Sequence, residues 1–364
     1  MTDEVALEHA VDERASDWDE LATRTAALPF VRPGWIRSWW EAFGHGDLAV
    51  LVARRDGRVT GVLPIQRVGG RVRLPANMES GAFELVAEDD RARGALVVGL
   101  YRLPSWSTEL QFLDVNGGDL PVARREADAA RRRRTERFVE RSPYVPVVGG
   151  FDVFLENRSA KLVADVRRRR RRLAEEAGSV ELVVSDGSEQ LHALREAGYA
   201  LEASGWKGEE RTSIGARPAA RRFYDAMTEW AAEEGILRLA FLRAGGRDVA
   251  FQLGIESDNV YYFCKGGYDV EYHRFAPGKL LVHDMLERAF ELRLRSFEFL
   301  GDAEAWKLDW TDAVRERRAL ETFDRSIRGS AAWAAERYGR PVAKRARLKT
   351  ALLAARRGLA RVRR

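Results

Sequence analysis

Apolar residues recur at helical spacing in several segments of the chain, and elsewhere they form short runs separated by turns. Residues 33–44 begin with Pro33 and end at Gly44, with apolar side chains spaced three and four apart, which predicts a short helix. The apolar runs 48–53 and 59–65 flank an Asp-Gly turn, the strongest short signal for a β-hairpin. A helix followed by a hairpin indicates a chain of α/β type.

Further elements follow this first hairpin. We expect a helix over 88–103, a strand over 109–115 and an arginine-rich helix over 123–140. Six consecutive arginines, Arg167 to Arg172, lie in another helix expected over 159–178. Because they spread around the whole helix, we interpret this segment as a largely solvated surface helix.

The order helix, strand, turn, strand then recurs. A helix is expected over 218–235 and strands over 236–242 and 248–255, and superposing Gly57 on Gly246 gives an offset of 246 − 57 = 189 residues. We interpret the recurrence as an ancient duplication. The expected fold class is α/β (α+β), with two similar halves, each a mixed, mostly antiparallel sheet flanked by helices. The expected units are an N-terminal half (1–155, degenerate), a C-terminal half (156–335) and a basic tail (336–364).

The C-terminal half continues with a strand over 258–264, the turn Pro277-Gly278, a helix over 279–294 and a strand over 296–300. In this arrangement a helix opens at the end of a strand. Free amides and the positive end of the helix dipole make such a place suited to an anion.

Composition narrows the class of protein. The 364 residues are 45% hydrophobic and 32% charged, which suits two folded domains with real cores. The first residues are acidic and unlike a signal peptide, no apolar run approaches a membrane span, and one cysteine, Cys264, allows no internal disulfide. These features predict a cytoplasmic protein.

Charge is unevenly distributed. The net charge is +5, yet residues 340–364 contain no acidic residue, and their apolar residues form a stripe with arginine and lysine on the other faces. This pattern favours a helix lying on an anionic membrane surface, with nucleic-acid contact and a disordered basic tail as alternatives. We therefore expect peripheral contact with the inner face of the membrane.

Lysine is rare, with seven among 61 basic residues. Arginine serves as the general cation in this sequence. We therefore interpret each lysine as a sign of a site that needs a compact ammonium; chance scatter of surface lysines is the alternative. Four of the seven lie beside glycine or an aromatic residue: Lys207, Lys265, Lys279 and Lys307.

Four short motifs together form a recognisable set. They are Trp206-Lys207-Gly208, the segment 262–269, the segment 276–281, and 297–302 followed by Trp306-Lys307 and Trp310. The set resembles the GNAT-type acyltransferases found beside exopolysaccharide and cellulose biosynthesis functions, which are similar in architecture to Fem-type aminoacyl transferases. The resemblance covers roughly residues 28 to 312. One departure is the phosphate-binding loop, which keeps only Arg274 and a single glycine, Gly278, of the usual pattern.

The resemblance implies an N-acyltransferase that moves an acetyl or other acyl group from acyl-coenzyme A directly to an amine. The acceptor would be an amino sugar, another glycan amine or an envelope polysaccharide precursor. Two alternatives stay open: a Fem-type transferase with aminoacyl-tRNA as donor and partner, and a catalytically inactive GNAT-like binding protein. The five histidines show no metal-ligand spacing, so no metal is expected.

The expected site residues fall into three groups. For coenzyme A they are Arg274, Pro277, Gly278, Lys279 and Leu280. For proton transfer and catalysis they are Asp302, Glu304, Tyr268 (as the acid) and Lys265, with Asp269 and His273 as further candidate bases. For the acceptor they are Trp206, Lys207, Asp269, Lys307 and Trp310.

Overall fold

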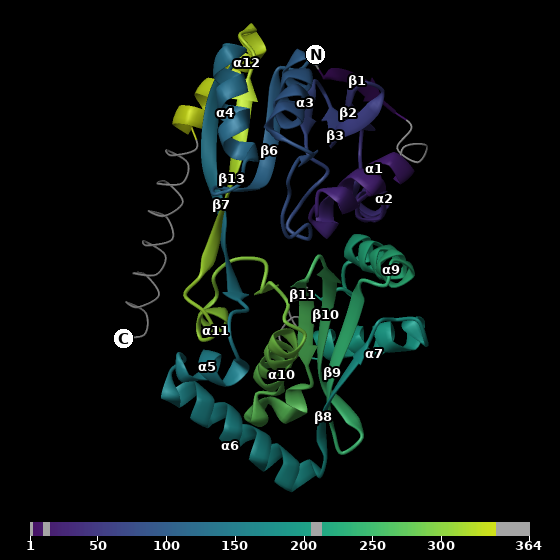
Figure 1. Cartoon of the computed structure of the whole chain (residues 1–364), viewed down its shortest axis with the longest axis vertical. Coiled ribbons are helices and arrows are strands. Elements are labelled where there is room, and N and C mark those ends of the chain that lie inside the picture. The colour runs from purple at the N-terminus through teal and green to yellow at the C-terminus, as the bar shows by residue number, and fades with distance from the viewer. Residues whose placement is uncertain (1–2, 10–14, 205–212, 340–364) are drawn as a thin grey trace, which may run out of the picture.

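The computed structural model describes residues 3–9, 15–204 and 213–339, and its strands form one continuous series (Figure 1). The strands are β1 (Glu4–Glu8), β2 (Asp47–Arg55), β3 (Arg58–Val68), β4 (Arg71–Arg73), β5 (Val86–Ala87), β6 (Ser107–Asp114), β7 (Arg133–Pro146), β8 (Val180–Ser185), β9 (Leu237–Ala244), β10 (Arg247–Ser257), β11 (Val260–Tyr268), β12 (Ser296–Glu298) and β13 (Val314–Phe323). Their order in space is β1-β2-β3-β4-β6-β13-β7-β12-β11-β10-β9-β8, with β5 beside β3. The pairs are antiparallel except β4–β6 and β11–β12, which are parallel.

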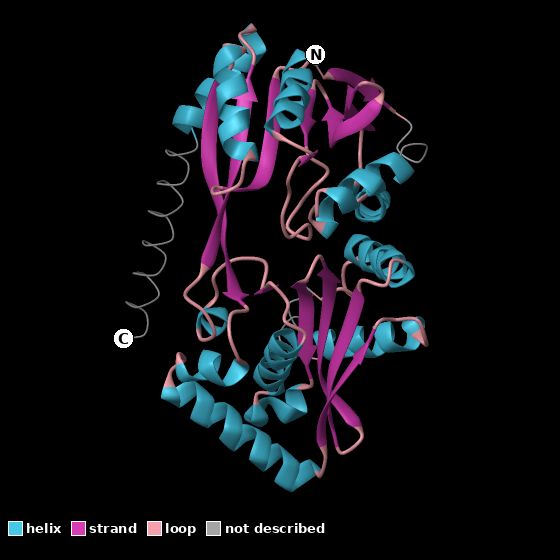
Figure 2. Cartoon of the chain, viewed as in Figure 1, coloured by secondary structure: helices cyan, strands magenta, loops and turns pink. Residues whose placement is uncertain are grey.

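Helices cover the faces of this sheet (Figure 2). They are α1 (Ala15–Arg24), α2 (Pro33–Phe43), α3 (Asp90–Arg102), α4 (Asp119–Ala129), α5 (Phe151–Glu156), α6 (Ala160–Ala177), α7 (Leu191–Ala203), α9 (Pro218–Glu233), α10 (Pro277–Glu291), α11 (Ala305–Leu308) and α12 (Ile327–Ala334), with short 3-10 turns at Pro29–Val31 and Val270–Phe275 and a π-helical turn at Ala335–Gly339. The expected fold class, a mixed sheet flanked by helices in two halves, is confirmed. None of the described helices is both long and apolar enough to cross a membrane.

The expected duplication is visible in the strand register. In the first hairpin Arg55 pairs with Arg58 and Ala53 with Gly61, on either side of a bulge. Adding 189 to each number gives the pairs Ala244 with Arg247 and Leu242 with Ala250, again across a bulge. The same offset turns the first parallel pair, Arg71 with Ser107, into Val260 with Ser296. The two halves therefore share one fold over this stretch without an insertion.

The predicted arginine-rich helix over 123–140 is wrong in its second part. Helix α4 ends at Ala129, and β7 begins at Arg133. This strand contains β-branched and aromatic residues such as Val139 and Tyr144, which suit a sheet. The second reason why this segment is a strand is a long-range one: β7 pairs along its length with β13, which lies near the end of the chain.

Strand β13 crosses the boundary expected near residue 155. It lies between β6 and β7 and pairs with both, although it comes near the end of the chain. In return, the last residues of β7 pair with β12 in the other half, with Val145 opposite Phe297. Figure 1 shows β7 and β13 running together from one half to the other. Each half thus holds a strand segment supplied by the other.

Helices α2 and α9, which the offset of 189 relates, also pack against each other between the halves. Trp35 and Phe223 meet edge to face with ring centroids 5.1 Å apart. Gly34 permits this approach, since a Cβ atom there would lie 2.1 Å from the Trp230 ring. One hydrophobic core continues across the contact. The two halves are consequently packed together and frame a shared site.

Candidate active site

Strands β11 and β12 separate in the middle of the C-terminal half. They pair in parallel from Val260 and Ser296 to Tyr262 and Glu298, where β12 ends. Strand β11 continues to Tyr268 with no strand on that side among the described residues. An extended ligand could therefore lie along this edge of β11.

A bulge lies where the edge opens. Leu253 of β10 pairs with Lys265 and Gly254 pairs with Phe263, so Cys264 is an extra residue in β11. Cys264 is partly buried, and burial raises the pKa of its thiol to about 12, which keeps it protonated and unreactive. The bulge changes the face on which the following residues lie and brings Lys265 toward the N-terminal half.

Two cavities, each of about 350 Å³, adjoin this edge. The first, the α10 cavity, is lined by the end of β11, the start of α10, α7 and the tryptophans 306 and 310. The second, the interface cavity, lies between the halves. Both are lined by Phe263, Gly266 and Trp306, so the two cavities meet at the open edge of β11.

The α10 cavity ends at the start of a helix. Ala276 has a left-handed conformation with φ 48°, Pro277 begins α10, and the Gly278 amide has no acceptor among the described residues. Free amides at a helix start, reinforced by the dipole, suit a phosphate group. Lys279 lines the cavity, with its Nζ atom 3.3 Å from Asp309 and 3.9 Å from Asp165.

The interface cavity has a charged wall made by both halves. Glu79, from the loop after β4, accepts hydrogen bonds of 2.8 Å from Arg217 and from the Tyr224 hydroxyl. Its Oε2 atom lies 3.0 Å from Lys265 Nζ. Burial alone would raise the pKa of the Glu79 carboxyl, but the Lys265 charge and these hydrogen bonds outweigh it and lower the pKa to about 2. Glu79 is therefore a fixed anion and a poor proton acceptor.

Lys307 lies on the same cavity and is almost fully buried. Its Nζ atom donates to the carbonyls of Leu300 and Asp302 at 2.8 and 3.0 Å. Burial lowers the pKa of this amine because the charged form loses solvation. Glu140, which also lines this cavity, forms an enclosed ion pair of 2.7 Å with Arg317 of β13.

The predicted catalytic residues are brought together only in part. Lys265 and Glu304 line the interface cavity, and Glu304 accepts a 2.5 Å hydrogen bond from the Trp306 indole. Asp302 lines neither cavity and instead accepts from the amides of Arg141 and Ala303, which lower its pKa. Asp302 is thus held as a turn cap and is a weak base.

Tyr268, expected as an acid, lies at the other cavity. It borders the α10 cavity, and its ring is 3.5 Å from the Cβ position of Gly278. His273 also lines this cavity, with its Nδ1 atom 3.0 Å from the Val270 carbonyl. Both are therefore at the α10 cavity and outside the lining of the interface cavity.

The predicted coenzyme A residues also divide. Pro277, Gly278 and Lys279 shape the start of α10, as expected. The Leu280 side chain is in the core and its amide donates to the Ala276 carbonyl, so neither faces the cavity. Arg274 is half exposed, paired with Glu176, and does not line the cavity.

Of the predicted acceptor residues, Lys307 and Trp310 line the interface and α10 cavities, respectively. Asp269 instead caps the turn that follows it and pairs with Arg247 at 2.5 Å. Trp206 and Lys207 lie outside the described residues. Glu79, Glu140 and Tyr224 escaped the sequence analysis because their neighbours at the cavity come from distant parts of the chain.

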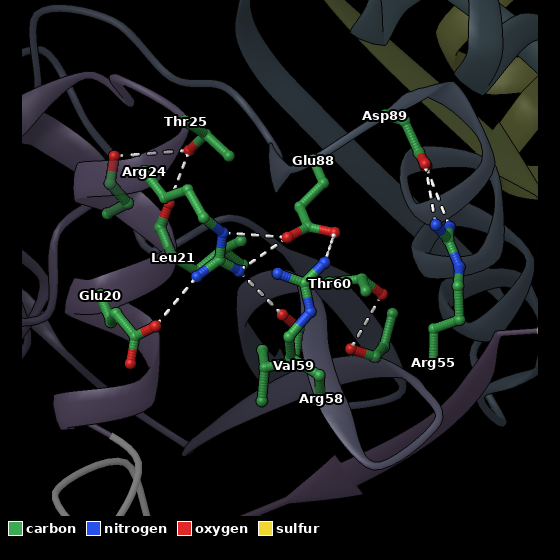
Figure 3. Close-up of polar contacts among 12 residues, drawn as sticks. Glu20, Leu21, Arg24, Thr25, Arg55, Arg58, Val59, Thr60, Glu88 and Asp89 are labelled. Atoms are coloured by element: carbon green, nitrogen blue, oxygen red, sulfur yellow. Dashed lines mark hydrogen bonds and ion pairs between the residues drawn. The ribbon is translucent and has the colours of Figure 1, made fainter.

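The corresponding helix start in the N-terminal half is acidic. The offset of 189 places Glu88, Asp89 and Asp90 over Pro277, Gly278 and Lys279. Figure 3 shows Glu88 bound by Arg24 and Arg58, and Asp89 bound by Arg55. Asp89 also accepts from the Ala92 amide and so occupies the helix start itself. Carboxylates here would repel a phosphate, so this helix start offers no equivalent anion site.

Comparisons with known proteins agree with this geometry. Residues 160–308 match the family model described as acetyltransferase (GNAT) domain. A comparison with curated protein sequences gave no significant match.

Similar solved structures cover nearly the whole chain. The C-terminal DUF2156 domain of a protein described as a putative lysylphosphatidylglycerol synthetase, from Agrobacterium fabrum, aligns with a TM-score of 0.56 and 12% identity, covering 90% of this chain and 96% of that one. L-PGS from Bacillus licheniformis has a TM-score of 0.51 at 10% identity, over 83% and 95%. FemX has a TM-score of 0.50 at 15% identity, over 84% and 95%. At these identities the likeness concerns the fold, and it supports the two-half GNAT and Fem-like architecture. Residues 160–308 form a GNAT acetyltransferase domain, and the protein is an acyltransferase.

Proposed function

We propose that the protein is an N-acyltransferase that transfers an acetyl or other acyl group from acyl-coenzyme A directly to an amine. The observation that carries the proposal is the meeting of the two cavities at Phe263, Gly266 and Trp306. A thioester carbonyl held at this junction would be open to an amine on the other side. Holding two reactants in this geometry supplies much of the rate of such a transfer.

In the proposed arrangement the diphosphate binds at Gly278 and the linear arm runs along β11. Lys279 is close enough to add a charge once it leaves Asp309. Tyr268, beside Gly278, would contact the phosphate end of the donor. The N-terminal half would bind no second donor, because its corresponding helix start carries Glu88 and Asp89.

The acceptor would occupy the interface cavity. Its neutral amine attacks the thioester carbonyl carbon, a C–N bond forms, the C–S bond breaks, and coenzyme A leaves as a thiolate that takes a proton from solvent. Glu304, at the rim of the cavity and largely exposed, accepts the proton released by the amine. Backbone amides at the open edge of β11 would stabilise the oxyanion.

We propose an amino sugar or an envelope polysaccharide precursor as the acceptor. Aromatic side chains beside polar groups, here Phe263, Trp306 and Glu304, suit a sugar ring that carries an amine. The link to polysaccharide rests on the family resemblance of the motifs around Lys265 and Lys307.

Titration calorimetry with acetyl-coenzyme A at moderate salt tests the donor. We expect one site per chain and binding weakened at least tenfold by Lys279→Glu, since a repelling charge replaces an attracting one. Arg222→Glu, an equal change of charge on an exposed position of α9, is the matched control and should leave binding unchanged. Two sites per chain would contradict the proposal, as would failure to bind.

A Fem-type donor is the second candidate. Lys279 and Arg274 are already paired with carboxylates, which reduces the charge available to a diphosphate, and FemX shares the fold. Absence of coenzyme A binding together with steeply salt-dependent binding of aminoacyl-tRNA would favour this candidate. Coenzyme A binding without acylation of any amine in a panel of amino sugars would instead indicate a binding protein.

A further inference from the structure

Gln252 lies at the centre of the C-terminal sheet and at the wall of the α10 cavity. On β10 it is paired with Ala240 on one side and Gly266 on the other. The side chain is therefore the part that reaches the cavity. The residue is only 2% exposed, and it lines the cavity together with Gly266 and Val282.

Among the described residues, the amide of Gln252 is only partly satisfied. Its Oε1 atom is 3.4 Å from the Tyr261 hydroxyl, and its Nε2 atom has no partner among the described residues. Reversing the amide would only exchange which of the two atoms lacks a partner. A buried polar group without a partner destabilises the fold, so its presence beside a cavity needs a reason.

Two other positions show that an unsatisfied glutamine is not required by the fold. Gln66, fully buried in the N-terminal half, has both amide atoms bonded: Nε2 to the His45 carbonyl at 2.6 Å and Oε1 to Arg73 at 2.9 Å. The position that corresponds to Gln252 by the offset of 189 is Leu63, which is fully buried. The half with an acidic helix start therefore carries leucine, and the half with Gly278 carries glutamine.

The location of Gln252 fits the path of an extended ligand. A ligand with a diphosphate at Gly278 lies beside Tyr268, and from there the strand leads back to Gly266 over about 7 Å. Gly266 is the direct neighbour of Gln252. An arm running along β11 toward Phe263 therefore passes the unsatisfied amide before it reaches the junction of the cavities.

We propose that Gln252 is a donor-binding residue that hydrogen-bonds an amide of a pantetheine-type arm, so that the α10 cavity selects thioesters carried on such an arm. The inference deepens the proposed function and rests on it. Selection would follow because the ester of a nucleotide ribose lacks an amide at this distance from its phosphates. The start of α10 holds the charged end of the donor, and Gln252 holds the middle.

Binding by Gln252→Leu and Gln66→Leu tests the inference. The probes are coenzyme A, which has adenosine, the diphosphate and the arm, and ADP, which has adenosine and the diphosphate without the arm. For Q252L we expect the Kd for coenzyme A to rise about tenfold, the loss of one hydrogen bond, with the Kd for ADP unchanged. The melting temperature without ligand should stay the same or rise, since an unsatisfied amide is removed. For Q66L, the matched control, the melting temperature should fall, and the Kd values for coenzyme A and ADP should both stay unchanged.

Each outcome has a distinct meaning. Failure of the wild type to bind either probe would refute the proposed function and this inference with it. Wild-type binding of coenzyme A that Q252L retains in full would refute the inference alone. An equal loss of coenzyme A and ADP affinity in Q252L would also refute it, because the residue would then act through the fold of the cavity rather than through the arm.

Discussion

Glu79 of the N-terminal half and Lys265 of the C-terminal half form an ion pair of 3.0 Å at the wall of the interface cavity. Arg217 and Tyr224 complete the surroundings of the Glu79 carboxylate. These contacts join a loop after β4 to β11 and α9. The geometry of the acceptor side thus depends on how the halves are held together.

Glu79→Gln should weaken this connection and leave Lys265 and Arg217 without their counter-charge. We expect a loss of about 3 kcal/mol in unfolding free energy, typical of a broken buried pair, and a raised KM for the acceptor. Urea unfolding and steady-state kinetics measure the two effects. Glu20→Gln removes an exposed pair with Arg24 and should cost no more than about 0.5 kcal/mol. Equal stability of the two variants would show that Glu79 does not join the halves.

Local patterns predicted those elements whose causes are local. The hairpin around Asp56 and Gly57 follows from residues that accept positive φ, and the helix from Pro33 follows from its capping and periodicity. Strand β7 was missed because its partner β13 lies over 160 residues later along the chain, and no local pattern reports such a pairing. Propensity is a weak guide where distant pairing decides.

Lys265→Met and Lys307→Met should each lower turnover at least tenfold while the protein stays folded and coenzyme A affinity is unchanged. Both lysines line the interface cavity and neither lines the α10 cavity. Methionine keeps the length of the stem and removes the amine. Steady-state kinetics, with circular dichroism for folding and calorimetry for coenzyme A, check the three statements. Unchanged turnover in both variants would show that neither lysine contributes to the reaction.

Asp309→Asn should strengthen coenzyme A binding by roughly three- to tenfold. Asp309 holds the Lys279 amine at 3.3 Å, and a diphosphate must compete with it for that charge. Calorimetry at two salt concentrations measures the gain, which should shrink at the higher one because salt screens charges. Weaker binding in this variant would mean that Asp309 positions Lys279 for the ligand instead.

Glu84 should make stability depend on pH. Burial raises the pKa of its carboxyl from 4.5 to about 7, so the folded protein holds this proton more tightly than the unfolded chain. Its contribution is complete below pH 4.5 and is lost as pH rises through 7. A pKa unit corresponds to roughly 1.4 kcal/mol. The unfolding free energy of Glu84→Gln, measured relative to that of the wild type, should therefore rise by about 3 kcal/mol between pH 5 and pH 8.

Urea unfolding at several pH values measures this difference. Glu291→Gln, at an exposed position, should show a difference from wild type that stays constant with pH. The same constancy in Glu84→Gln would contradict the assignment of a raised pKa.

Truncation after Tyr338 should abolish binding to anionic vesicles of phosphatidylglycerol. The removed segment contains residues 340–364, which lie outside the described residues and carry no acidic side chain. Sedimentation with vesicles measures binding, and neutral phosphatidylcholine vesicles are the control. Equal sedimentation of the truncated protein with the anionic vesicles would remove the proposed membrane contact.

The site was predictable where one segment builds it alone. The turn at Pro277-Gly278 and the lysines 265, 279 and 307 could be selected from the sequence, because glycine turns and rare residue types are visible there. Glu79 could not be selected, since an isolated glutamate in a loop has no signal until its partners are known. Gln252 looked like an ordinary strand residue, and only its unsatisfied amide distinguishes it.

The position of β13 has a consequence for how the protein is made. The sheet that begins with β1 lacks the strand between β6 and β7 until residue 323 has left the ribosome. During translation, β6 and β7 would therefore each have an unpaired edge until β13 is made, and a chain with such edges is prone to aggregation. In a fragment that ends at residue 155 these edges would stay unpaired. We therefore expect that neither half, expressed alone, gives a stably folded fragment.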